Sequence, residues 1–197
     1  MKCNFLKRIN DYLNDWRIFM KSTFDEIYDK YHQDIYQFVF YMVKDKQLCD
    51  DLVQDTYIKI LQSLSTFRGE SSKKTWLLSI ARHVVIDYFR SQKRKRNYIL
   101  DFFNWHDKGE LIQDHLPLPD DIVIKNEEIK KVYHYLDKCT PDQKSVLILR
   151  FIQSLSIQET AEVLDFSISK VKTTQHRGLK VIRNHLSEIE SRKGDTQ

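Results

Sequence analysis

Apolar residues recur at steps of three and four along most of this 197-residue chain. One series includes Phe24, Ile27, Tyr31, Ile35 and Phe38, and similar series cover about 52–64 and about 75–93. Because a helix brings residues three and four apart onto one face, each series predicts an amphipathic α-helix. The three helices together predict a bundle. The chain holds only 4 Gly and 3 Pro, which excludes a turn-rich all-β fold.

Composition changes twice after the third predicted helix. Five positive charges fall within 90–96, and six acidic residues against a single lysine follow within 101–121. That second stretch also contains Gly109, Pro117 and Pro119 and shows no sustained periodicity. These features are typical of a linker between domains. The fold we expect is all-α, with two small helical domains joined by a flexible acidic linker.

Helical steps resume at about 124–136 and continue nearly to the carboxyl terminus. The expected segments are an amino-terminal extension at 1–20, a first domain at 21–95, the linker at 96–121, a second domain at 122–188 and a tail at 189–197.

The amino-terminal extension has two interpretations. Phe5, Ile9, Leu13 and Trp16 follow helical steps, which favours an extra amphipathic helix. Alternatively, translation begins at Met20.

The sequence also limits the cellular compartment in which we expect the protein. No window is long and apolar enough for a transmembrane helix, and the charged amino terminus lacks the apolar core of a secretory signal. The three cysteines are far apart, and neither they nor the histidines have metal-ligand spacing. We expect a cytoplasmic protein without a metal or cofactor and without direct membrane insertion.

The second domain contains a pair of helices joined by a short turn. Ser156 and Glu159 form a capping-box pattern for a helix ending near 164, and Ser167 can cap a final helix that reaches about 186. Ile157, Leu164, Ile168 and Val171 are the residues predicted to fill the core between these helices. The arrangement predicts a helix-turn-helix, whose second helix enters the major groove of DNA.

Charge supports this interpretation, because 167–185 contains five Lys or Arg and no acidic residue. The predicted DNA contacts are the hydrogen-bonding side chains near the start of the final helix: Ser169, Lys170, Lys172, Thr173, Gln175, His176 and Arg177. If each cation neutralises one phosphate, log affinity should fall against log salt with a slope of about −4 to −5. The alternative is a capped helical hairpin with a solvated basic face.

The first domain contains an acidic, hydrogen-bonding segment at the expected start of its second helix. Its candidate residues are Asp50, Asp51, Gln54 and Asp55. The helix dipole alone favours Asp near a helix amino terminus. Three carboxylates exceed that need, so a docking face for a basic partner is the second interpretation.

The third helix has a polar side that is bordered by a polar loop at 68–74. Candidate nucleic-acid contacts there are Arg68, Gly69, Ser71, Lys73, Lys74, Arg82, His83, Asp87 and Arg90. A basic helix face can hold a nucleic-acid backbone while the loop receives an unstacked base. An ordinary amphipathic helix with a solvated basic end explains the spacing equally well.

Three of these segments, in this order, resemble the extracytoplasmic-function (ECF) sigma factors of bacterial RNA polymerase. The likeness covers about 23–186. Residues 51–58 resemble region 2.2, residues 75–90 resemble regions 2.3 and 2.4, and residues 155–164 with 167–178 resemble region 4.2. The segments 41–46 and 172–180 look most like the sigma-X type. His83 departs from the pattern, since many members carry Asn there.

The resemblance implies an alternative sigma factor that directs core polymerase to promoters and starts transcription. By this likeness, the final helix reads the −35 element, while the third helix and the 68–74 loop take the −10 element. Asp50, Asp51, Gln54 and Asp55 would bind the β′ clamp helices, with a further contact to the β flap. A membrane-anchored anti-sigma factor is an expected partner.

No catalytic constellation is recognisable, so we do not expect an enzyme. Two other classes of protein are alternatives to a sigma factor. A stand-alone two-domain repressor would bind DNA without polymerase and would have no use for the acidic segment. A metal-dependent nuclease would use Asp50, Asp51 and Asp55 as ligands.

Overall fold

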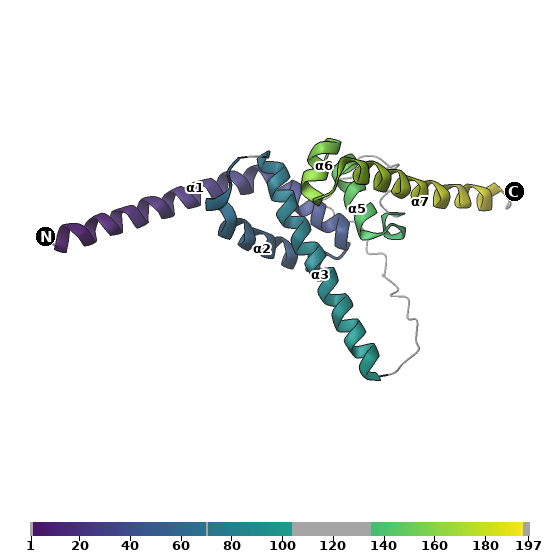
Figure 1. The fold of residues 1–197 in the computed structure, drawn as a ribbon, viewed down its shortest axis with the longest axis horizontal. Helices are drawn as coiled ribbons and strands as arrows, with labels where there is room; N and C mark the ends of the chain where they lie inside the picture. The colour runs from purple at the N-terminus through teal and green to yellow at the C-terminus, as the bar shows by residue number, and fades with distance from the viewer. Residues whose placement is uncertain (1, 70, 104–134, 195–197) are drawn as a thin grey trace. The chain divides into compact units, whose positions relative to one another are not determined.

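The structure is a computed structural model that describes residues 2–69, 71–103 and 135–194, with side chains described at 22–69, 71–95 and 135–187. Every regular element in these ranges is helical, which agrees with the expected all-α class (Figure 1). The chain divides into two compact units, 1–34 and 35–197. No helix in the described ranges is long and apolar enough to cross a membrane.

Helix α1 (Lys2–Val43) makes up the first unit and continues into the second. The backbone at 2–20 is helical. Within the first unit Ile27 is buried, and the rings of Tyr28 and His32 stack with their centroids 4.5 Å apart. The helix includes the apolar series predicted at 24–42.

The second unit begins with the end of α1, which leads into α2 (Lys46–Ser63), the turn η1 (Leu64–Thr66) and α3 (Lys73–Phe103). Lys44 takes a left-handed φ of 56° and ends α1. Asp45 then caps α2 by accepting a hydrogen bond from Leu48 N at 2.8 Å. Helix α2 packs on α3. The core of this part consists of fully buried apolar residues, including Ile35, Phe38, Ile60, Leu77 and Leu78.

Helix α3 is longer than predicted. The sequence favoured an end near 93, whereas the helix continues through the basic run to Phe103. Neither Gly nor Pro occurs between 93 and 103, and Lys, Arg and Leu are good helix formers, so nothing local ends the helix. The rest of the predicted linker and the helix expected at about 124–134 lie outside the described residues.

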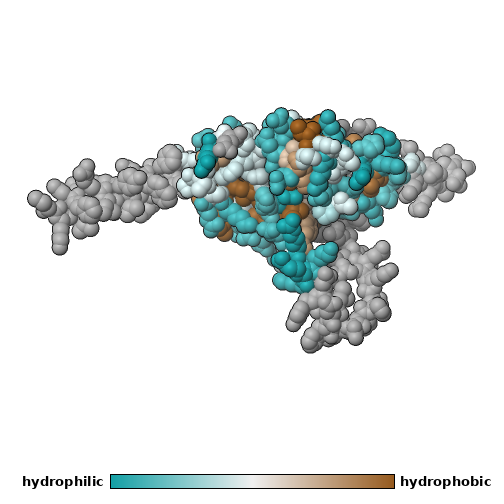
Figure 2. Space-filling model, in the orientation of Figure 1, coloured by the Kyte–Doolittle hydropathy of each residue, from teal (hydrophilic) through white to brown (hydrophobic). Residues whose placement is uncertain are grey.

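The carboxyl-terminal part begins with the turn η2 (Leu136–Lys138) and α5 (Pro141–Leu147). A π-helical turn, η3 (Ile148–Ile152), leads to α6 (Ile157–Leu164) and α7 (Ile168–Gly194). Thr140 and Gln143 form a capping box with Pro141 at the first helical position. The π-helical turn was not predicted, and it leaves Phe151 exposed. Figure 2 shows hydrophilic residues over most of the visible face, with smaller hydrophobic areas among them.

Candidate nucleic-acid interface

Helix α6 begins with the capping box that the sequence predicted. Glu159 N donates to Ser156 Oγ at 3.1 Å, and Ser156 N donates to Glu159 Oε2 at 2.8 Å. Hydrogen bonds to the carboxyl from the backbone N–H of Ser156 and from its side chain lower the pKa of Glu159. The capping-box bonds fix the first turn of the helix that precedes the candidate recognition helix.

The turn between α6 and α7 depends on a left-handed residue. Asp165 has φ 53° and ψ 47°, and Phe166 N donates to Ala161 O at 3.0 Å. Ser167 then caps α7, because Lys170 N donates to its Oγ at 3.2 Å. The predicted cap is confirmed, and the chain reverses within three residues as a helix-turn-helix requires.

The core between α6 and α7 is mostly the predicted one. Leu164 and Val171 are buried, and Ile157 is half-buried. Ile168 was placed in this core wrongly, since its side chain is 49% exposed. Side chains of a helix tilt toward its amino terminus, so at the first residue of α7 the isoleucine leans past the end of the contact.

One stripe of α7 carries most of the predicted −35 contacts. The exposed residues are Ser169, Lys170, Lys172, Thr173, His176 and Arg177. Ser169, Lys172, Thr173 and His176 follow three- and four-residue steps along one exposed face of the helix. We call these four residues the α7 stripe.

Gln175 lies on the opposite face of α7. It is half-buried, on the same side as the buried Val171, Gly178 and Ile182. Its Oε1 accepts a hydrogen bond from Arg150 Nε at 3.2 Å. The structure therefore places Gln175 among the anchoring residues of α7, apart from the other predicted contacts.

Three residues missed in the sequence fix the position of α7. Arg150 also donates from Nη1 to Leu155 O, which joins η3 to the loop before α6. At Gly178 an added Cβ would lie 3.0 Å from Leu147 Cδ1, so the glycine lets α7 approach α5 closely. Phe166, in the turn between α6 and α7, contacts α7 through Lys170, whose Nζ lies 3.3 Å from the centroid of its ring. The sequence signals that could have identified two of these residues are a glycine within a helix, for Gly178, and an aromatic residue within a turn, for Phe166.

On the polar side of α3, some residues are exposed, whereas others are half-buried or form ion pairs. His83 is exposed, and its Nδ1 lies 2.7 Å from Ser79 O. Asp87 faces Lys59 of α2 and Arg90, each at 3.7 Å. Both ion pairs are well exposed and contribute little to stability. Arg82 is half-buried, and burial lowers the pKa of its guanidinium.

The loop before α3 is shorter than predicted, because Lys73 and Lys74 belong to the first turn of the helix. Arg68 and Gly69 are exposed, and Ser71 is half-buried. The loop ends are held together by the rings of Phe67 and Trp76, whose centroids are 4.7 Å apart. Gly69 has φ 73°, and no atom lies within 4 Å of where a Cβ would stand.

The acidic segment of α2 faces solvent. Asp50, Asp51, Gln54 and Asp55 are all exposed. The helix starts at Lys46, four residues before the predicted start, so the acids lie beyond its first turn, where the dipole effect has faded. The helix dipole alone therefore explains the presence of these acidic residues less well.

Two apolar side chains extend this acidic face. Ile58 is 53% exposed and Leu61 is 39% exposed. They follow Asp51 and Asp55 at helical steps, so α2 presents an acidic and apolar surface, which we define by Asp51, Asp55, Ile58 and Leu61. In the ranges the structure describes, no cluster of His, Cys, Asp or Glu could hold a metal ion.

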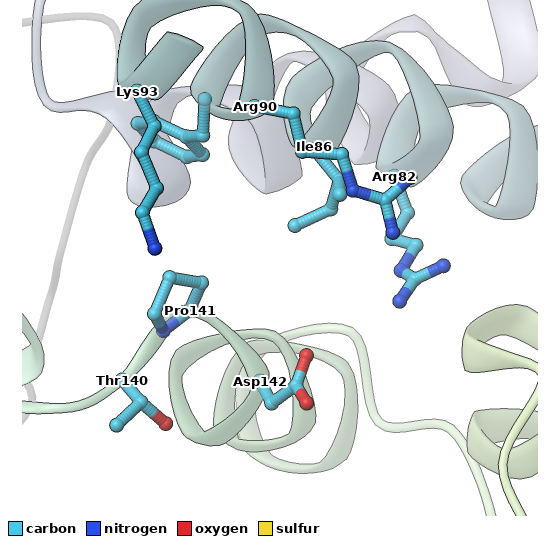
Figure 3. A pocket seen from close by; sticks show the side chains of 8 residues that line it. Arg82, Ile86, Arg90, Lys93, Thr140, Pro141 and Asp142 are labelled. Carbon is cyan, nitrogen blue, oxygen red and sulfur yellow. The ribbon is translucent and has the colours of Figure 1, made fainter. Parts of the chain in front are cut away.

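A groove of about 540 Å³ lies between α3 and α5 (Figure 3). Its polar lining comes from Arg82, Arg90 and Lys93 on one side and from Thr140 and Asp142 on the other. Three cations of α3 thus face the carboxyl-terminal part of the chain: Arg82, Arg90 and Lys93.

Comparison with known proteins identifies both parts of the chain. The family model for sigma-70 region 2 matches residues 27–95, and the model for sigma-70 region 4 matches residues 129–182. The ECF RNA polymerase sigma factor SigX of Bacillus subtilis (strain 168) is 57% identical over 167 residues, which cover 85% of each chain. The sigma factor YlaC of the same organism is 32% identical over 85% of this chain and 94% of its own.

Solved structures share the fold. The sigma factor RpoE, in complex with the anti-sigma factor NepR from Bartonella quintana, has a TM-score of 0.66 at 22% identity, covering 84% of this chain and 97% of its own. CnrH, in complex with the cytosolic domain of CnrY, has a TM-score of 0.61 at 19% identity, covering 85% and 90%. The chain belongs to the ECF sigma factors of the sigma-70 family, is similar to the sigma-X type, and acts as a non-enzymatic factor that directs RNA polymerase to promoters.

Proposed function

We propose that the α7 stripe reads the −35 element of the promoters this sigma factor selects. The observation that carries the proposal is the position of Ser169, Lys172, Thr173 and His176 on one exposed face of α7. The short polar side chains and the lysine suit base edges and phosphates in a major groove. Lys170 and Arg177 flank the stripe and add phosphate contacts.

The −10 element is assigned to α3 and the loop before it. His83 and Arg90 are exposed on the helix, and Arg68 and Gly69 are exposed in the loop. Cations along the helix hold the strand backbone, while the loop receives an unstacked base. Asp87 is exposed on the same helix, within 3.7 Å of Lys59 and of Arg90.

The acidic and apolar surface of α2 is the proposed site for core polymerase, at the β′ clamp helices. Exposed carboxylates next to exposed apolar side chains suit a partner helix that carries basic and apolar residues. The carboxyl-terminal domain would contact the β flap, so both DNA-reading parts are held on one enzyme and the second contact becomes effectively intramolecular.

An anti-sigma factor anchored in the membrane is a further proposed partner. Support comes from the solved relatives, which are complexes of a sigma factor with NepR and of CnrH with the cytosolic domain of CnrY.

In vitro transcription with core polymerase and a promoter library tests these assignments. Thr173→Val and His176→Ala should change the preferred −35 bases, whereas Lys138→Ala, an exposed lysine in the same part of the chain, should not. An unchanged −35 preference in both stripe variants would contradict the assignment to α7.

Pull-down of core polymerase tests the α2 surface. The double variant Asp51→Lys/Asp55→Lys should lose core binding, and Glu162→Lys, an exposed acid on α6, should keep it. A wild type that fails to bind core polymerase, together with DNA binding by the double variant, would support a stand-alone repressor. Loss of core binding in the double variant alone would not.

A further inference from the structure

Lys170 is a cation in the first turn of the recognition helix α7. Its backbone N–H donates to the cap residue Ser167 at 3.2 Å, and it is the third residue of the helix. The positive end of the helix dipole disfavours a cation at this position. A neighbouring group that holds the ammonium therefore offsets a cost that the helix itself imposes.

The ring of Phe166 is that neighbouring group. Lys170 Nζ lies 3.3 Å from the ring centroid, well inside the distance of about 6 Å over which a ring face attracts a cation. Asp142 Oδ2 is a weaker partner, because it lies 4.0 Å from the same Nζ and both side chains are about half exposed. The ring is therefore the group that holds the ammonium at the start of α7.

The turn between α6 and α7 fixes the position of this ring. Asp165 takes the left-handed conformation with φ 53°, and Phe166 N donates to Ala161 O at 3.0 Å. The Phe166 side chain is half-buried, and Arg82 Cζ of α3 lies 5.8 Å from the ring centroid. A ring placed in this way is a fixed support for a lysine, whose four-carbon stem is otherwise flexible.

The ring leaves the ammonium open to a second ligand. The side chain of Lys170 is 51% exposed, and an ammonium has three N–H donors, which cannot all point to one ring face. Lysines and helix amino termini are both common partners of DNA phosphates, and Lys170 combines the two next to the α7 stripe. A phosphate can therefore bind the ammonium while the ring stays in place.

We propose that Phe166 is a positioning residue for promoter recognition, because its ring holds the Lys170 ammonium ready to contact a phosphate of the −35 element. The inference rests on the proposed function of α7 and adds the residue that orders one of its phosphate contacts. A free lysine side chain loses rotamer freedom when it binds, which lowers affinity by about two- to tenfold. A side chain that the ring has already ordered avoids this loss.

A double-mutant cycle tests the proposal in the holoenzyme, by fluorescence anisotropy of a labelled promoter duplex. Phe166→Leu should weaken binding by about two- to tenfold when Lys170 is present. Lys170→Met, which keeps an apolar stem, should weaken binding and lower the slope of log affinity against log salt by about 1. In the Lys170→Met background, Phe166→Leu should have no further effect, whereas a merely structural role of Phe166 would weaken binding in both backgrounds.

Two further changes separate the charge of the ring face from the shape of the ring. Phe166→Tyr retains an electron-rich face and should bind as the wild type does. Fluorination of the Phe166 ring keeps its shape but weakens its negative face, so it should reproduce the loss caused by Phe166→Leu. The fluorinated chain also decides the question if circular dichroism shows that Phe166→Leu loses its helices.

Phe151→Leu is the matched control, because it makes the same change at an exposed phenylalanine in η3. Its effect on binding should be the same with Lys170 or with methionine at that position. Equal losses from Phe166→Leu in both backgrounds, or tighter binding after this change, would overturn the positioning role. Unaltered binding by the fluorinated chain would overturn it as well.

The proposed function and the positioning role fail in different ways. Unaltered affinity and salt slope in Lys170→Met would contradict the phosphate contact itself, and the positioning role with it. Weaker binding by Lys170→Met, with unaltered binding by Phe166→Leu, would contradict only the positioning role.

Discussion

Arg150 Nε donates to Gln175 Oε1 at 3.2 Å, and this bond joins the π-helical turn η3 to the inner face of α7. The same guanidinium donates to Leu155 O, so one side chain connects η3, the loop before α6 and the recognition helix. Arg150 is half-buried, which makes these bonds stronger than at a free surface.

Arg150→Met should lower the free energy of unfolding by about 2–3 kcal/mol, because two bonds from a charged donor are lost. Gln175→Leu, which removes one acceptor, should lower it by about 1 kcal/mol. Urea unfolding of the two single variants and the double variant would measure the coupling between them. Strict additivity would mean that the bond does not form in solution.

Gly178→Ala should destabilise the domain by about 1 kcal/mol, even though alanine favours helices. The new Cβ would stand 3.0 Å from Leu147 Cδ1, and Leu147 is buried, so it cannot move aside freely. Overpacking of this kind costs about 1–3 kcal/mol, which exceeds the gain in helix propensity. Thermal unfolding provides the measurement, and a rise in Tm would contradict the close approach of α7 to α5.

Replacing Lys172 by alanine should weaken binding to all −35 sequences alike. If the ammonium contacts a phosphate, the slope of log affinity against log salt should fall by about 1. Thr173→Val should leave that slope unchanged and alter only the preferred bases. Titrations of several duplexes at a series of salt concentrations separate these effects, and a base-dependent loss in Lys172→Ala would reassign the lysine to a base edge.

Acid should weaken the contact of Asp137 with two lysines, in which its carboxylate accepts from Lys44 Nζ at 2.7 Å and from Lys144 Nζ at 2.9 Å. Burial alone would raise the pKa of the Asp137 carboxyl, but Lys144 and Lys44 outweigh it, so the pKa is lowered. A carboxyl with a lowered pKa contributes stability above its unfolded pKa, about 3.9, and that stability is lost as the pH falls through the folded pKa. Asp137→Asn should lack this part of the acid dependence in urea unfolding between about pH 5 and pH 2.

Lys44 should make stability depend on pH in the alkaline range. Burial lowers the pKa of its ammonium, and the bond to Asp137 only partly offsets burial. The unfolded chain therefore keeps this proton to a higher pH than the folded chain. Stability should rise as the pH increases through the folded pKa toward the unfolded value of about 10.4, and Lys44→Asn should lose that rise.

Local chemistry predicted the helix starts and the turn of the carboxyl-terminal domain well. Ser156 and Ser167 cap their helices as predicted, because a cap depends on residues within one turn. The three-residue turn and the acid-free stretch at 167–185 were equally visible in the sequence.

Features that depend on distant partners could not be predicted. Gln175 follows the recognition pattern in sequence, but its face of α7 is set by packing against α5 and by Arg150. Ile168 has the right spacing for the core and still lies outside it. The contact of Phe166 with Arg82 and the contact of Asp137 with Lys44 each join segments about ninety residues apart, which no local periodicity encodes.

The π-helical turn at Ile148–Ile152 gives the domain an unusual vulnerability to changes in chain length. Such a turn contains one residue more than the α-helix it interrupts. Deleting that residue would let the helix continue regularly to its end near Ile152 and rotate the positions after the deletion, up to that end, by about 100°. Arg150 would then no longer face Gln175, so a single deletion here should disturb promoter choice more than most substitutions on the DNA-facing side.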